Sequence, residues 1–133
     1  MTRTKPQPRN VESPFALSEL FFSRTDLRGV IHSGNRVFTR VSGYTAAELA
    51  GRPHNIIRHP EMPRAVFELL WENLKADRPI CAYVKNMAKD GSYYWVFASV
   101  YPVPGGYLSI RLKPTSAIFA TDRKSPRLNS SHT

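Results

Sequence analysis

The clearest pattern along the chain is a run of apolar residues at helical spacing with polar residues between them. Its members are Val66, Phe67, Leu70, Trp71 and Leu74. This period predicts a helix that buries one face. Two prolines three residues apart cannot both lie inside one helix, so we expect Pro60 in a turn and Pro63 at the first helical position. A stiff polar turn therefore precedes the helix.

Three extended runs follow, at residues 80–89, 92–103 and 107–112. Asp90-Gly91 is a hairpin dipeptide that supplies positive φ angles, and glycines after Pro104 make the next turn. In the middle strand both alternating faces are apolar or aromatic. One face packs on the helices, and the other requires a cover, either the apolar N-terminal segment or a second subunit. We therefore expect a homodimer.

Earlier in the chain, the short apolar runs 20–24 and 29–32 predict a hairpin around the polar tetrapeptide 25–28. Asn35 is expected to cap a short helix that ends at Gly43.

A second short helix is expected to follow, because Thr45 and Glu48 have the spacing of a capping box. Gly51 and Pro53 are expected to end it.

Two strands, a group of helices and three further strands predict an α+β domain. We expect a five-stranded antiparallel sheet with short helices and one longer helix on one face, and a ligand-sized cavity between helices and sheet. The domain is expected over residues 20–114. Residues 1–19 form an N-terminal extension, and residues 115–133 are a linker and a tail that resembles vector-encoded sequence.

The charge distribution argues against a nucleic-acid surface. The formal net charge is +9, but three of these charges lie in residues 1–10 and three in residues 123–133, which leaves +3 for residues 11–122. A single cysteine, Cys81, excludes an internal disulfide and a thiolate metal site. The sequence has no apolar run of about 18 residues, so we expect a cytoplasmic segment that does not contact the membrane.

Polar groups crowd the turn before the long helix. Asn55, Arg58, His59 and Glu61 stand close together, bracketed by apolar residues. A cluster of this kind is either a loop that faces water or one side of a ligand pocket, and the turn alone does not decide between them.

Several motifs of this chain resemble the PAS domain family. They are Val-Ser-Gly-Tyr-Thr at 41–45, Asn-Ile-Ile-Arg-His-Pro-Glu-Met-Pro at 55–63, Lys-Asp-Gly at 89–91 and Tyr-Trp-Val at 94–96. The likeness covers roughly residues 20–113. The Arg-His-Pro-Glu-Met-Pro string is similar in particular to the flavin-binding sensory domain of bacterial aerotaxis receptors.

That resemblance implies noncovalent FAD binding, sensing of oxygen or redox state, and a signal to downstream segments of the same receptor. The site residues that it implies are Asn35, Arg58, His59, Glu61, Phe67 and Asn86. Glu61 stands where relatives usually carry Asp, and Ile80 stands where the best-known relatives carry a Trp, so stacking on the flavin from that position is lost.

The chemistry of FAD matches these residue types. Arg58 suits the diphosphate and Asn86 the polar edge of the flavin ring. Asn35 also fits a helix cap alone, and His59 fits a hydrogen-bonded loop histidine. We expect Trp71 and Trp95 in the core.

A sensor is favoured over an enzyme, because no nucleophile is paired with a base and no nicotinamide-binding glycine fingerprint is present. Two alternatives stay open. One is a haem-binding gas sensor that uses His54 or His59 as ligand, and the other is a cofactor-free PAS dimerisation module. Blue-light adduct chemistry is disfavoured, because the helical segment carries no cysteine.

Overall fold

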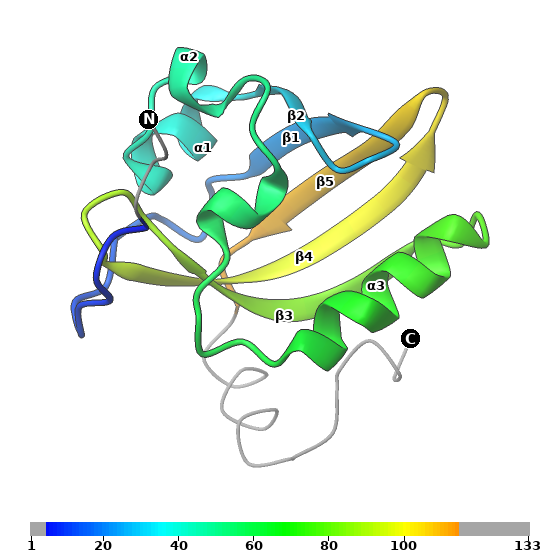
Figure 1. The fold of residues 1–133 in the computed structure, drawn as a ribbon. Helices are drawn as coiled ribbons and strands as arrows, with labels where there is room; N and C mark the ends of the chain where they lie inside the picture. The colour runs from blue at the N-terminus through cyan, green and yellow to red at the C-terminus, as the bar shows by residue number, and fades with distance from the viewer. Residues whose placement is uncertain (1–4, 115–133) are drawn as a thin grey trace.

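The computed structural model describes residues 5–114, so the expected C-terminal linker and tail lie outside the described residues. In chain order the elements are β1 (Phe21–Asp26), β2 (Ile31–Gly34), α1 (Arg36–Ser42), α2 (Ala46–Leu49), the 3₁₀ helix η1 (His54–Ile57), α3 (Arg64–Lys75), β3 (Ile80–Met87), β4 (Tyr93–Val103) and β5 (Gly106–Leu112). Figure 1 shows a curved sheet with the helices over it. The expected α+β fold is confirmed.

The sheet is antiparallel throughout and has the strand order β2-β1-β5-β4-β3. Strand β1 of the first hairpin therefore pairs with the last strand, β5, so the first and last strands of the domain lie side by side within the sheet. The long helix α3 contacts β3 and β4, whereas α1 and α2 contact β1 and β2. The space between α3 and the centre of the sheet is left for the side chains that face inward.

Local capping signals explain the short helices. The side chain of Asn35 accepts a hydrogen bond from the Phe38 amide, and Gly43 ends α1 in the left-handed conformation. Thr45 and Glu48 form the expected capping box of α2. Helix α3 begins one residue after Pro63, which is its N-cap. These three helix starts are confirmed within the usual uncertainty of a helix boundary.

The first hairpin differs from the expectation. The sequence predicts Thr25 and Asp26 in the turn, but both belong to β1, where they pair with Tyr107 and Gly106 of β5. The turn lies further on, and the Asp26 carboxylate organises it by accepting hydrogen bonds from the backbone amides of Arg28 and Val30. Pairing with a distant strand overrides the polar turn signal.

The β3–β4 hairpin is confirmed, with one correction. Only Gly91 has a positive φ, +90°, whereas Asp90 does not. The Asp90 carboxylate instead accepts hydrogen bonds from the amide and hydroxyl of Ser92. A Cβ atom at Gly91 would also collide with the backbone carbonyl of Gln7, so the N-terminal segment lies directly against this turn.

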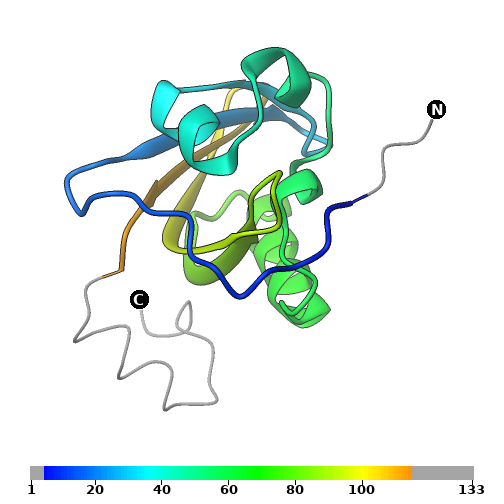
Figure 2. The same cartoon turned by 90° about the vertical axis from the view of Figure 1, so that its left-hand side faces the viewer.

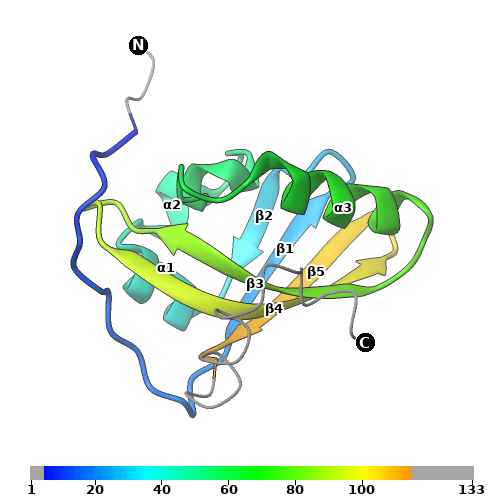
Figure 3. The ribbon, with the colours of Figure 1, turned by 90° about the horizontal axis from the view of Figure 1, so that it is seen from below.

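The N-terminal segment is tied to the hairpin over residues 9–13. The amide of Arg9 donates to the carbonyl of Gly91, and Ser13 and Tyr93 are linked in the same way. Figures 2 and 3 both show this dark-blue stretch passing the tip of the β3–β4 hairpin. Phe15 then enters the core, edge-on to Phe21. The segment is therefore packed against the domain at the end of the sheet.

The outward face of the sheet is only partly covered. Phe22 is 39% exposed and Tyr101 is 40% exposed. The expected cover by the N-terminal segment is thus incomplete among the described residues, and the homodimer stays a prediction.

The buried core lies on the inward face, between the sheet and the short helices. Phe21, Phe38, Ile57, Tyr94 and Val96 are at most 1% exposed. Neither tryptophan belongs to this buried set, so the expectation for both was wrong. Trp95 points outward from β4, because it alternates with the buried Tyr94 and Val96. Trp71 lines a cavity.

Candidate functional site

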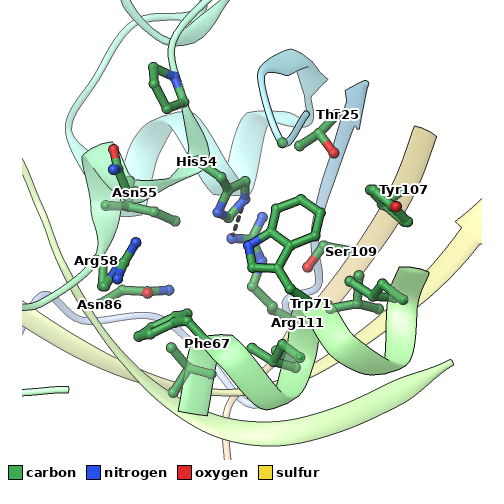
Figure 4. Close-up of a pocket in the computed structure, with 18 of the residues that line it drawn as sticks. Thr25, His54, Asn55, Arg58, Phe67, Trp71, Asn86, Tyr107, Ser109 and Arg111 are labelled. Carbon is green, nitrogen blue, oxygen red and sulfur yellow. Dashed lines mark hydrogen bonds between the residues drawn. The ribbon is translucent and has the colours of Figure 1, made fainter. Parts of the chain in front are cut away.

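A cavity of about 240 Å³ lies between α3, the η1 loop and the sheet. Figure 4 shows its labelled side chains converging from these three sides. The side chains contributed by the strands form the sheet floor of the cavity: Thr25, Val84, Asn86, Val96, Ala98, Val100, Tyr107, Ser109 and Arg111. Most of this floor is apolar, and its few polar groups are spaced apart.

Helix α3 supplies the opposite wall. Its apolar face carries Phe67, Leu70, Trp71 and Leu74, all of which line the cavity. The indole of Trp71 meets the ring of Tyr107 edge-on, with ring centroids 5.5 Å apart. The apolar stripe was therefore predicted correctly, but it borders a hollow and does not pack solidly against the sheet. Aliphatic and aromatic walls of this kind suit a flat apolar ligand.

Arg58 stands at the rim of the cavity. Its guanidinium lies 4.2 Å from the centre of the Phe67 ring, a favourable cation–π arrangement. Among the described residues Arg58 has no carboxylate partner. Arg58, Phe67 and Trp71 also border a shallow groove on the outer side of α3, which contains Arg64 and Lys75. Arg58 thus faces both the cavity and the outside.

The loop that carries Arg58 is held in place from two sides. Ile56 and Ile57 are buried beneath it, as the sequence predicts. From outside, the Lys5 ammonium donates hydrogen bonds to the backbone carbonyls of Asn55 and Arg58, at 2.8 and 2.9 Å. The position of the arginine therefore depends on packing and on the N-terminal segment.

Asn86 lies on the sheet floor and is 4% exposed. An isolated bridge joins its backbone to that of Arg58. The amide side chain makes no hydrogen bond to any other described residue. A buried amide that faces a cavity and has no partner within residues 5–114 is suited to a polar ligand edge.

The other three predicted site residues lie outside the cavity lining. Asn35 caps α1 and also accepts a hydrogen bond from the Phe22 amide. His59 is 2% exposed, and its Nδ1 accepts a hydrogen bond from the Glu61 amide. Glu61 forms a 2.7 Å ion pair with Lys85. The structure brings together Arg58, Phe67 and Asn86 and leaves Asn35, His59 and Glu61 around them as supports of the fold.

Two of these supporting side chains, His59 and Glu61, have lowered pKa values. Burial and the nearby Lys85 lower the pKa of His59, so the imidazole is neutral near pH 7. The hydrogen bond from Lys85 lowers the pKa of Glu61. Neutral His59 is thus able to act as the acceptor that its contact with the Glu61 amide requires.

The sequence did not single out a polar cluster inside the cavity. Arg111 on β5 is 2% exposed, and its Nη2 donates to the Ser23 hydroxyl at 2.7 Å. The His54 Nε2 lies 3.2 Å from that hydroxyl and 3.4 Å from Arg111 Nη1. Because a guanidinium only donates, the network assigns His54 Nε2 as the acceptor. Figure 4 shows His54 and Arg111 converging, with a dashed line between them.

The electrostatics of this cluster are unusual. Burial, with a contribution from Arg111, lowers the pKa of His54 to about 3. Burial also lowers the pKa of Arg111 to about 10, which leaves it protonated near pH 7. The cluster therefore carries one positive charge, on Arg111. A sequence signal for it existed, because the period-two alternation of β5 places a charged residue on the same inward face as Tyr107 and Ser109.

The described residues contain no group of three or more side chains arranged to hold a metal ion. None of the described helices has both the length and the apolar character needed to cross a bilayer.

Comparison with known proteins identifies the family to which this fold belongs. The family described as PAS fold matches residues 31–107. The aerotaxis receptor of Escherichia coli (strain K12) is 42% identical over 115 residues, which cover 83% of this chain and 23% of that receptor. The chain therefore spans about a quarter of the length of this relative.

Two solved structures share the fold. The PAS domain of a protein from Colwellia psychrerythraea has a TM-score of 0.66 and 22% identity, covering 72% of this chain and 86% of that one. A light-oxygen-voltage domain from a study of a flavin analogue has a TM-score of 0.66 and 19% identity, covering 81% of this chain and 87% of that one. With the family match over residues 31–107 and the likeness to an aerotaxis receptor, the chain belongs to the PAS family.

Proposed function

We propose that this PAS domain binds FAD without a covalent bond and senses redox state or oxygen for an aerotaxis receptor. The observation that carries the proposal is the composition of the cavity. Apolar walls from α3 and the sheet enclose it, and Asn86 lies on its floor. Arg58 stands at its rim, where it rests on the Phe67 ring and has no carboxylate partner among residues 5–114. The likeness to the E. coli aerotaxis receptor supports the same function.

The size of the cavity fits one part of FAD. At about 240 Å³ it is smaller than the roughly 300–1,000 Å³ typical of sites that enclose a whole drug-sized ligand. A flat ring system suits the interior, and the charged diphosphate suits the rim, where Arg58 and the groove with Arg64 and Lys75 supply cations. When bound, FAD supplies the electron transfer; the protein supplies shape, hydrogen bonds and charge.

Trp71 gives the cavity an aromatic wall, although this chain has Ile80 where the best-known relatives carry a Trp. Ile80 begins β3 and is not part of the cavity lining. Trp71 and Tyr107 border the cavity from the helix and the sheet. Aromatic contact with a flavin ring is thus available from α3, and the absence of a Trp at position 80 does not remove it.

The remaining parts of the proposal concern the wider protein. The domain acts as a cytoplasmic, non-enzymatic sensor whose change of state is read by downstream segments of the same receptor. It forms a homodimer through the partly exposed outward face of the sheet, where Phe22, Tyr101 and Leu112 are each at least 36% exposed. Light scattering at micromolar concentration tests the dimer, and a strict monomer would contradict it.

The test of the cofactor is the absorption spectrum of the purified protein. We expect a yellow protein whose flavin bands bleach with dithionite and return in air. Colourless protein that does not take up FAD when the cofactor is added would reject the proposal.

The haem alternative is tested by the same spectrum, which would then show a sharp haem band. The structure disfavours it, because His54 Nε2 is engaged by Ser23 and Arg111 and His59 lies outside the cavity lining. The cofactor-free alternative requires side chains to fill the cavity. The open volume beside Trp71 and Asn86 favours a ligand.

A further inference from the structure

Arg111 is a cation that the fold buries in the lining of the cavity. It is 2% exposed, it lies on a central strand, and among the described residues no carboxylate pairs with it. Within this described part of the chain, its Nε is buried without a hydrogen-bond partner. Burying a cation in this way is costly unless something compensates the charge.

The immediate neighbours of Arg111 supply little compensation. Ser23 and His54 are neutral hydrogen-bond partners. The faces of two aromatic rings, Phe38 at 4.5 Å and Phe21 at 5.6 Å, add cation–π attraction. None of these groups carries a negative charge. The open side of the guanidinium is the cavity itself, since Arg111 is part of its lining.

We propose that Arg111 is a fixed positive charge in the cavity wall that makes the site bind reduced flavin more tightly than oxidised flavin. This inference rests on the proposed function, because it concerns the same site. A flavin ring gains electron density on reduction and is neutral when oxidised, so a nearby cation favours the reduced form. The protein thereby raises the reduction potential at which the sensor responds.

The structure also explains why the charge stays fixed. Arg111 opposes Ala98 on β4 and Phe21 on β1, so its backbone is paired on both sides. The hydrogen bond to Ser23 at 2.7 Å then fixes the direction of the guanidinium. A charge held by the sheet is preorganised and does not need to move when the ligand changes state.

The test is the midpoint potential of FAD-loaded protein, measured by spectroelectrochemistry, together with the affinity for oxidised FAD. We expect Arg111→Met to reduce the preference for reduced over oxidised flavin at least tenfold, which lowers the potential of a two-electron couple by about 30 mV. The affinity for oxidised FAD should change less than this. Arg111→Lys keeps the charge and should keep most of the potential.

A second variant keeps the test independent of the folding of Arg111→Met. Ser23→Asp places a carboxylate next to the Nη2 of Arg111, which neutralises the charge and should also lower the potential. Ser23→Ala leaves the charge in place and removes only the hydrogen bond that directs it, so it should lower the potential less than Ser23→Asp does. Arg24→Met is the matched control for both changes, because Arg24 is an exposed arginine on the outward face of β1, next to Ser23 in the sequence.

The possible outcomes separate the two proposals. If Arg111→Met or Ser23→Asp binds FAD and keeps the parent potential, the inference is overturned while FAD binding stands. If the Arg24→Met control shifts the potential as much as these variants, general charge is responsible and the inference is also overturned. If the parent protein binds no FAD, the proposed function fails and the inference fails with it.

Discussion

Arg58 and Arg111 face the same cavity, and among the described residues neither has a carboxylate partner, yet the fold holds them in different ways. Arg58 belongs to a loop at the rim, where it is partly exposed and rests on the Phe67 ring. Arg111 belongs to a central strand and is hydrogen-bonded to Ser23. A rim cation is able to hold the charged part of a ligand, whereas a buried cation acts on the ligand through its field.

We therefore expect Arg58 to contribute mainly to the affinity for FAD and Arg111 mainly to the reduction potential of the bound flavin. Removing the rim arginine should weaken binding of either redox form, because a diphosphate has the same charge in both. Changing the buried cluster should alter the balance between forms or the acid stability of the domain. The variants below test this difference at each end of the cavity.

The largest effect is expected for Arg58→Ala. A charge-assisted hydrogen bond to phosphate contributes roughly 1.5–3 kcal/mol, so FAD affinity should fall about ten- to a hundredfold. Arg58→Lys should recover only part of it, because a point charge does not reproduce a planar fork. Titration of the apo protein with FAD measures both.

The control for this variant is Arg36→Ala, which removes an exposed cation at the start of α1, away from the cavity and the outer groove. Thermal unfolding of the apo protein should be the same for Arg58→Ala and the parent. Unchanged FAD affinity in Arg58→Ala would make the arginine a surface residue. A destabilised apo form would show that it holds the loop together.

The next effect concerns His54 and the acid stability of the apo domain. The folded pKa is lowered to about 3, below the ordinary value near 6.5, so between these values the unfolded chain binds a proton that the folded protein does not. The contribution of His54 to the free energy of unfolding is therefore fully present above about pH 6.5 and is lost progressively as the pH drops toward 3. The slope from this group is at most about 1.4 kcal/mol per pH unit.

Urea unfolding of apo protein at a series of pH values measures this slope. We expect His54→Gln to reduce it, because glutamine does not titrate. His32→Gln removes an exposed histidine of β2 and serves as the control. An equal slope in His54→Gln and the parent would show that His54 is not the group responsible.

A smaller effect is expected for Asn86→Ala. A neutral hydrogen bond contributes about 0.5–1.5 kcal/mol net, so FAD should bind roughly two- to tenfold more weakly. Apo stability should not fall, because the amide has no partner among the described residues. Ser99→Ala, on the outward side of β4, is the control. FAD affinity equal to that of the parent would remove Asn86 from the site.

The smallest effect is expected for Lys5→Met. This change removes two exposed hydrogen bonds to the carbonyls of Asn55 and Arg58. The rim loop should loosen, and FAD should dissociate about two- to fivefold faster. Stopped-flow dissociation measures it, with Arg9→Met as a control from the same segment. An unchanged rate would show that the N-terminal segment does not hold the rim.

Much of the fold was determined by the sequence through local interactions. The caps at Asn35 and Thr45, the turn at Gly91 and the apolar stripe of α3 depend on neighbours a few residues away, and all are confirmed. The family motif also identified the loop with Arg58, because it forms one continuous string. Three of the six predicted site residues line the cavity, while Asn35, His59 and Glu61 do not.

Only the tertiary structure decided what lies opposite each of these elements. The pairing of β1 with β5 placed Thr25 in a strand and brought Ser23 within reach of Arg111, 88 positions later in the sequence. The same closure left Trp71 facing a cavity instead of a packed core. A hydrophobic period reports that one face avoids water, but it does not report whether that face meets side chains or an enclosed space. Contacts between distant segments settle that question, and the cavity and its buried charge arise from them.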